Sequence, residues 1–133
     1  MDMPRKRRAQ IIIPAGLCPW PHELRVAKIL SLAGHTVEFL PTRTSKTADI
    51  LLDGIEFEIK SPLTNKPKKI LRNLKRALLQ SKNVIIDSSR IKGVRDDTVR
   101  KLLADRAKDQ TTLKRLLLIT KHGQIIDIMA IAR

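Results

Sequence analysis

Apolar residues recur at two different spacings along the chain, and together they predict an alternation of helices and strands. Residues 21–33 and 67–81 carry apolar side chains three and four positions apart, which is the spacing of one helix face. Both segments have a proline at or near their start, where a helix tolerates it. A third helix is expected at 96–107, with Asp96 or Asp97 as its cap. Short apolar runs between turn residues predict strands at 11–13, 36–40, 83–87, 113–120 and 124–129.

Residues 48–61 hold two runs of alternating apolar and polar side chains on either side of Asp53-Gly54. An Asp-Gly pair readily adopts the positive φ angles that a two-residue hairpin turn needs. Such a turn fixes the register and places Asp49 directly opposite Glu58. Because successive side chains point to opposite faces of a strand, the hairpin has one apolar and one charged face. The apolar face comprises Ile50, Leu52, Ile55, Phe57 and Ile59, and the other comprises Asp49, Leu51, Glu56, Glu58 and Lys60.

Two carboxylates directly opposite each other repel and weaken the pairing of their strands. A positive group is therefore expected between Asp49 and Glu58, and it is either Lys60 or a divalent cation. Carboxylate oxygens suit Mg²⁺ or Mn²⁺. A carboxylate pair with such a cation and a lysine can hydrolyse a phosphodiester, because the metal activates water and the lysine steadies developing negative charge. The alternative is a solvated hairpin face with an ordinary ion pair.

The spacing Asp49, eight residues, Glu58-Ile-Lys60 resembles the Asp…Glu-x-Lys signature of PD-(D/E)XK nucleases, with Ala48 where the name has proline. This resemblance makes Asp49, Glu58 and Lys60 catalytic residues, with both carboxylates as ligands of Mg²⁺ or Mn²⁺. The predicted order of elements gives an α/β fold with a central mixed β-sheet flanked by helices. The resemblance adds that its core is restriction-endonuclease-like, of the PD-(D/E)XK type.

A longer likeness covers residues 22–128. An early helix with Glu23, the run EIKSP at 58–62 and a basic helix leading into LLQSKNVIID at 78–87 occur in the order of the C-terminal tRNA-nuclease toxin domains of contact-dependent growth inhibition systems. The chain resembles these domains, which are metal-dependent nucleases neutralised by a cognate immunity protein. The resemblance implies the same activity and a cognate immunity protein. Because the chain has a formal charge of +14, we expect that partner to be acidic and to cover a groove between the hairpin and the basic helix 67–81.

Further candidates for the site come from its expected surroundings. Glu23 lies in the first turn of a helix, where the helix dipole stabilises a negative charge; the resemblance makes it a third carboxylate at the metal. Its neighbour His22 is a candidate general base, although a lone histidine more often serves as a cap. Gln80 corresponds to a glutamine of the related domains, and Ser61 directly follows Lys60, so both are accessory candidates.

The charge balance favours a nucleic-acid partner. Lysines and arginines number 27 against 13 acids, a formal charge of +14, and such an excess indicates a polyanion, nucleic acid before membrane. The segment between Glu58 and Asp87 contains no acid, whereas a merely soluble helix face mixes both signs. We interpret it as a phosphate-binding surface beside the hairpin, a soluble face being the alternative. Its residues are Lys66, Lys68, Lys69, Arg72, Lys75 and Arg76, joined by Arg43 and Lys46 from the preceding loop.

The composition bears on where the protein acts and on how it would recognise a nucleic acid. The aromatic residues are Trp20, Phe39 and Phe57, with no tyrosine, so recognition by several stacked bases is a poor fit. Cys18 is the single cysteine, which excludes an internal disulfide and a cysteine-based zinc site. No apolar run reaches the ~20 residues of a membrane span, and no secretory signal follows the basic start. We expect action in the cytoplasm, of a target cell if the protein is a delivered toxin.

The expected organisation is a flexible basic arm at 1–10 followed by a single nuclease-like domain at 11–133. Three functional interpretations stay open at this stage. The first is a tRNA-cleaving toxin domain, and the second is a DNA nuclease of the repair, recombination or restriction type. The third is a catalytically inactive nucleic-acid-binding protein of the same fold. The oligomeric state is unknown from the sequence.

Overall fold

The structure is a computed structural model, and it describes residues 9–41 and 48–132. The strands within these residues are β1 (Ile11–Ile12), β2 (Val37–Phe39), β3 (Ile50–Leu52), β4 (Ile55–Lys60), β5 (Asn83–Asp87), β6 (Arg115–Ile119) and β7 (Ile125–Asp127). The helices are α1 (Pro21–Leu32), α2 (Pro67–Ala77), α3 (Asp96–Ala107) and α4 (Ile128–Ala132). None of the helices in these two ranges is both long and apolar enough to cross a membrane.

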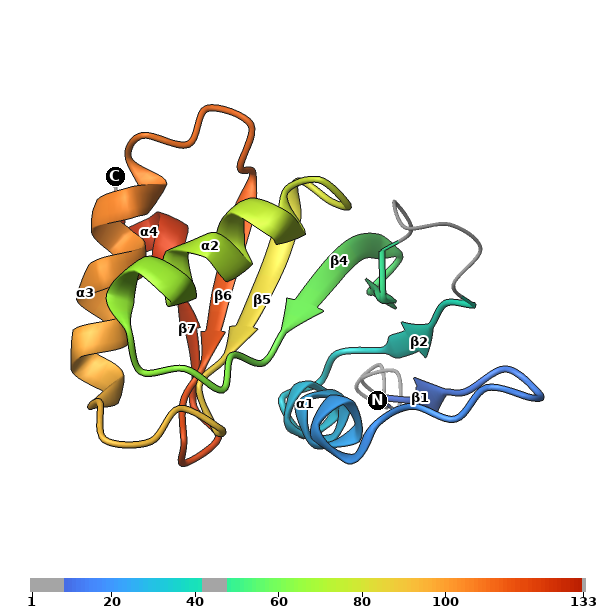
Figure 1. Ribbon diagram of the computed structural model, residues 1–133. Helices are drawn as coiled ribbons and strands as arrows, with labels where there is room; N and C mark the ends of the chain where they lie inside the picture. Colours follow the sequence, from blue (N-terminus) through green and yellow to red (C-terminus); the bar gives the residue numbers. More distant parts are fainter. Residues whose placement is uncertain (1–8, 42–47, 133) are drawn as a thin grey trace, which may run out of the picture.

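The strands form one mixed sheet in the order of the chain, from β1 to β7. β4, β5 and β6 run parallel, as do β1 and β2, whereas the remaining neighbours are antiparallel. The parallel pairs β4–β5 and β5–β6 need crossover connections, and α2 and α3 provide them. Figure 1 shows α2 and α3 on one side of the sheet and α1 on the other, where the curled strands β1 to β3 wrap beside it. The predicted α/β fold with a central mixed sheet is therefore confirmed.

Each face of the sheet has its own hydrophobic core. Val84 and Ile86 of β5 pack with α2 and α3, whereas Ile85 between them packs with the α1 side. This alternation explains why β5 is an uninterrupted apolar run: both of its faces are buried. The apolar face of the hairpin packs toward α1, because Ile50, Phe57 and their apolar neighbours belong to the core on that side. The charged face of the hairpin consequently lies on the α2 side.

The hairpin has the predicted register. Ile50 pairs with Phe57 and Leu52 with Ile55 around the two-residue turn. Both turn residues have positive φ, 49° at Asp53 and 84° at Gly54, as a type I′ turn requires. Asp53 also fastens the turn to β2, since its Oδ1 accepts the N–H of Thr36 and its own N–H donates to Thr36 O, both at 2.8 Å.

The structure corrects two local predictions. The helix over 96–107 begins after Arg95, and Asp96 does not cap it. Its carboxylate instead accepts hydrogen bonds from Ser88 Oγ and Lys121 N and joins the ends of β5 and β6. Although burial works against it, these donors lower the pKa of Asp96.

The expected final strand over 124–129 is divided into β7 and α4. Asp127 Oδ1 accepts the N–H groups of Met129 and Ala130 at 3.1 and 3.4 Å, so its side chain starts a helix where the apolar pattern alone suggested a longer strand. β7 is also the last strand of the sheet. The apolar pair Ile125-Ile126 therefore lies on an edge strand.

Candidate functional site

The charged face of the hairpin brings Asp49, Glu58 and Lys60 together. Glu58 is only 2 % exposed, and its Oε2 lies 3.2 Å from Lys60 Nζ. Asp49 Oδ2 accepts the N–H of Ile59 at 2.8 Å, a bond across the hairpin that fixes its carboxylate beside Glu58. Glu58 Oε1 is buried and has no hydrogen-bond partner among the described residues. A buried oxygen without a partner is costly, so this site has the capacity for one more positive group or donor.

The electrostatics of the pair point the same way. Burial, followed by the neighbouring carboxylate of Asp49, raises the pKa of Glu58 to about 8, and Lys60 opposes this only in part. Without a further cation, Glu58 keeps its proton near neutral pH, because a buried carboxyl next to another carboxylate does not ionise easily.

A divalent cation would replace that proton, and the donor set fits one. Mg²⁺ and Mn²⁺ prefer oxygen ligands, and Mg²⁺ is usually held by one or two carboxylates with waters and phosphate oxygens completing the shell. Within residues 9–41 and 48–132, no three histidine, cysteine or acidic side chains converge as a metal site. Asp49 and Glu58 are therefore the pair that could hold the ion, with the other positions left to water and substrate.

Glu23 and His22 lie at the start of α1 and have partners of their own. Glu23 Oε1 accepts the N–H of Trp20 at 2.9 Å and so closes the first turn of the helix. The ring of His22 stacks on Trp20, and its Nδ1 lies 3.3 Å from Arg90 Nη1. The structure does not bring Glu23 into a three-carboxylate group with Asp49 and Glu58.

A buried network centred on Asp87, at the end of β5, was not predicted from the sequence. Asp87 is fully buried and accepts hydrogen bonds from Arg25 Nη1 and Ser61 Oγ, both at 3.0 Å, and from Ser89 Oγ at 2.9 Å. Ser61 directly follows Lys60, so the network ties the end of β4 to β5 and α1. The one available signal was the acid that ends the apolar run NVIID. Ser61, expected as an accessory residue, thus has an anchoring contact.

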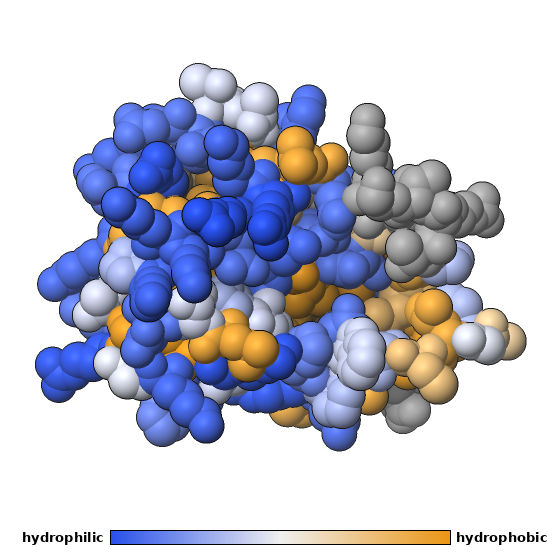
Figure 2. Space-filling model, viewed as in Figure 1, coloured by the Kyte–Doolittle hydropathy of each residue, from blue (hydrophilic) through white to orange (hydrophobic). Residues whose placement is uncertain are grey.

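The basic surface forms on α2 as predicted. Ile70, Leu74 and Ala77 are buried against the sheet, which turns the lysines and arginines outward. Figure 2 shows hydrophilic side chains crowded over α2 and α3, with a recess between them and α1. Lys66, Lys68, Lys69, Arg72, Lys75 and Arg76 are all exposed.

A groove of about 290 Å³ between α2 and α3 adds Arg106 to this surface, opposite Lys68, Arg72 and Lys75. Gln80 lies elsewhere, in a hollow of about 550 Å³ with Glu56 and Lys82 near the hairpin turn. Arg43 and Lys46, the remaining phosphate-binding candidates, lie outside the described residues, as does most of the basic arm expected at 1–10.

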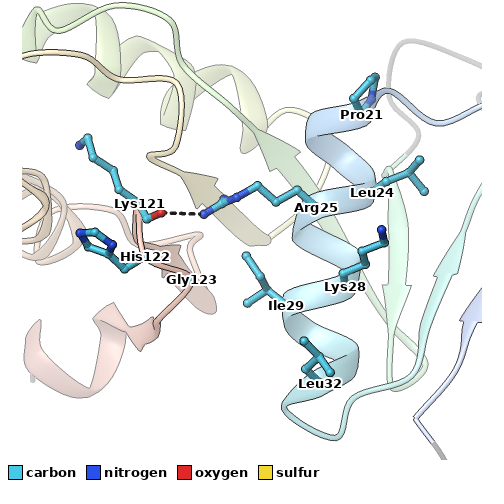
Figure 3. Close-up of a pocket in the computed structure, with 9 residues that line it drawn as sticks. All are labelled: Pro21, Leu24, Arg25, Lys28, Ile29, Leu32, Lys121, His122 and Gly123. Carbon is cyan, nitrogen blue, oxygen red and sulfur yellow. Dashed lines mark hydrogen bonds between the residues drawn. The ribbon is translucent and has the colours of Figure 1, made fainter.

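Another hollow, of about 600 Å³, lies on the α1 side of the molecule, away from the charged hairpin face. Figure 3 shows Leu24, Ile29 and Leu32 along α1 on one side and the turn 121–123 on the other. Arg25 crosses between them, and its Nη2 donates to Lys121 O at 3.0 Å and Thr120 O at 3.2 Å. This hollow is not a candidate catalytic centre, because none of the described residues that line it is acidic.

The chain matches a known protein family. A family model described as the contact-dependent growth inhibition CdiA C-terminal domain matches residues 46–125, well over half of the chain. The chain belongs to this family. In this CdiA C-terminal domain, the matched segment includes Asp49, Glu58 and Lys60 and the whole of α2. The resemblance to contact-dependent growth inhibition toxins seen in the sequence is thereby confirmed.

A solved structure has the same fold. A chain of the CdiA-CT/CdiI toxin and immunity complex from Burkholderia pseudomallei superposes with a TM-score of 0.67 at 15 % sequence identity, over 90 % of this chain and 98 % of that chain. A search of curated proteins gives no match. The CdiA C-terminal domain thus shares its fold with a chain of that complex at low sequence identity.

Proposed function

We propose that this CdiA C-terminal domain is a metal-dependent nuclease that hydrolyses phosphodiester bonds at Asp49, Glu58 and Lys60, with tRNA as the favoured substrate. The observation that carries the proposal is the buried Oε1 of Glu58, which has no hydrogen-bond partner within residues 9–41 and 48–132 and lies beside a second carboxylate. A hairpin that only supports the fold, or only binds nucleic acid, gains nothing from this unfavourable arrangement. A phosphodiesterase does gain from it, because the two acids would hold a divalent cation that supplies Lewis-acid chemistry at the phosphate.

Asp49 and Glu58 would hold Mg²⁺ or Mn²⁺, which when bound supplies a Lewis acid and an activated water. The residues of the chain do the rest. The N–H of Ile59 orients the Asp49 carboxylate. Lys60 Nζ, 3.2 Å from Glu58 Oε2, is positioned to donate to the attacking water or to the phosphate oxygens as negative charge develops on them.

The exposed basic residues of α2 would hold the phosphate backbone next to this centre. Among the described residues, none of these lysines and arginines forms an ion pair with an acid, so their charge is available to a polyanion. Contacts of this kind position a nucleic acid without reading its sequence. The basic surface therefore supports nucleic-acid binding in general.

We assign the domain to the PD-(D/E)XK nucleases with a restriction-endonuclease-like core. The support is the Asp49…Glu58-x-Lys60 spacing, carried by antiparallel β3 and β4 in a mixed sheet with helices on both faces. Glu23 stays an accessory candidate, because its helix cap would have to open for the carboxylate to reach the metal.

An acidic immunity protein is the proposed partner. The similar solved chain comes from a toxin and immunity complex, and a protein of +14 formal charge attracts an acidic partner at a high rate. We propose that the domain acts in the cytoplasm of a target cell and that its partner covers the basic surface of α2.

The experiment that tests this function is cleavage of total tRNA and of plasmid DNA, side by side, with Mg²⁺, with Mn²⁺ or with EDTA. We expect tRNA to be cut only when metal is present. Cutting of plasmid alone would make the domain a DNA nuclease of the same type. Salt-sensitive binding of both without cutting would identify an inactive nucleic-acid-binding protein and overturn the proposal.

A further inference from the structure

We propose that Trp20 is the stacking platform for one unpaired nucleobase at the end of the sheet where β4 delivers Lys60, an inference that rests on the proposed nuclease function. Trp20 is the single tryptophan of the chain and is 68 % exposed. It belongs to neither hydrophobic core. An indole in this position therefore contributes little to the fold and presents an aromatic face to a ligand.

The surroundings of Trp20 fix the ring before any ligand arrives. Its indole stacks on His22 with a centroid separation of 6.4 Å and an interplanar angle of 11°, an offset parallel arrangement typical of aromatic pairs. The stacked ring of His22 is held in turn by Arg90, whose Nη1 lies 3.3 Å from His22 Nδ1. The backbone N–H of Trp20 donates to Glu23 Oε1 at 2.9 Å. One face of the indole is thus supported, and a ligand would lose little freedom of the ring on binding.

A short chain of contacts connects this platform to the catalytic hairpin. Arg90, which touches His22, follows three residues after Asp87, and Asp87 accepts a hydrogen bond from Ser61, the neighbour of Lys60. Arg25, one turn along α1, binds the same Asp87. In Figure 1 the arrowheads of β4 and β5 point toward the part of the molecule where α1 lies. Trp20 and Lys60 are therefore linked through the ends of these strands, with Trp20 at the start of α1 and Lys60 on the hairpin face that lies toward α2.

The chemistry around Trp20 selects a nucleobase over another apolar partner. Arg90, which lies against His22, provides positive charge for a phosphate, and stacking on an aromatic ring accepts any base because every base has a π-face. A single platform holds one base rather than a strand of them, in keeping with the scarcity of aromatic residues. A base inside a duplex cannot reach it. We infer that the domain recognises an unpaired nucleotide, as in an RNA loop, next to the phosphate it cuts.

The single tryptophan makes the test direct. In EDTA, so that no cleavage occurs, intrinsic fluorescence is followed while a short single-stranded oligoribonucleotide, a duplex RNA of equal charge or inorganic polyphosphate is added. We expect the single strand alone to quench Trp20. Trp20→Leu should weaken single-strand binding by about 5- to 150-fold, the range of one base stack, leave polyphosphate binding within about 2-fold, and Trp20→Phe should recover most of the loss. Leu32→Ala, a change of a 90 % exposed residue at the other end of α1, is the matched control.

Three results would overturn the inference. The first is single-strand binding with no quenching, and the second is a Trp20→Leu variant that loses affinity for polyphosphate and RNA equally. The third is a Trp20→Leu variant that binds RNA normally but loses the immunity protein, which would make Trp20 a protein contact. Because binding is measured without metal, these outcomes are separate from the proposed nuclease activity: stacking without cleavage refutes the activity alone, and cleavage without stacking refutes the platform alone.

Discussion

Replacing Glu58 by glutamine is expected to stabilise the metal-free protein at neutral and alkaline pH. Burial and the Asp49 carboxylate raise the pKa of Glu58 from its ordinary 4.5 to about 8, so the folded state favours the protonated acid. The contribution of this group to stability is fully present below about pH 4.5 and is lost as the pH rises through about 8. Glutamine has the same shape, needs no proton and can donate its amide hydrogen to Asp49.

The size of the effect follows from the shift. At pH 7 an acid with a pKa near 4.5 has lost its proton, so folding with Glu58 protonated costs about 3 kcal/mol of folding free energy. Glutamine avoids this cost. The Glu58 side chain is almost completely buried, so solvent screening reduces this free energy only slightly. For a domain of this length the change raises Tm by about 10 °C.

The assay is thermal and urea unfolding in EDTA between pH 5 and 9. The wild type should lose stability across this range, whereas Glu58→Gln should change much less. Glu56→Gln, an exposed position of the same strand, is the control and should follow the wild type. Added Mg²⁺ should stabilise the wild type more than Glu58→Gln, because a ligand stabilises only the form it binds. Parallel curves for wild type and Glu58→Gln in EDTA would refute the reasoning.

Three further outcomes are expected. Arg25→Ala should lower the free energy of unfolding by about 3 kcal/mol in urea, since it leaves the buried carboxylate of Asp87 without its cation; Lys28→Ala, exposed on the same helix, should change it by less than ~0.5 kcal/mol. Arg72→Ala should weaken RNA binding and reduce the slope of log affinity against log salt by about 1, measured by titration at several salt concentrations; an unchanged slope would remove Arg72 from the phosphate contacts. Gly54→Ala should cost about 1 kcal/mol in thermal unfolding because its φ is 84°, and equal stability would contradict the type I′ turn.

The hairpin could be predicted from the sequence because its determinants are local. The Asp53-Gly54 turn sets the register, and the alternation of side chains then decides which residues share a face. These two facts are sufficient to place Asp49 beside Glu58 and Lys60. The helices α1 and α2 could be predicted for the same reason, since a proline marks each start and the apolar stripe is continuous.

Contacts between distant segments could not be predicted in this way. Asp87 looks like the end of a buried strand, and only the parallel pairing of β4 with β5 and the packing of α1 bring Arg25 and Ser61 to it. Polar side chains near helix ends also bind partners that the pattern of apolar and polar residues does not specify. Asp96 binds the ends of two strands instead of capping its helix, and Asp127 starts α4 where the apolar residues suggested continued strand.

The measurement that tests the central claim most directly is metal-dependent cleavage of tRNA by Asp49→Ala and Lys60→Ala, with tRNA binding measured on the same samples. Lys28→Ala serves as the control for loss of one positive charge. Both site variants should lose cleavage, keep most of their affinity for tRNA and remain folded, while Lys28→Ala should cut normally. Full cleavage by Asp49→Ala would contradict the assignment of the catalytic centre.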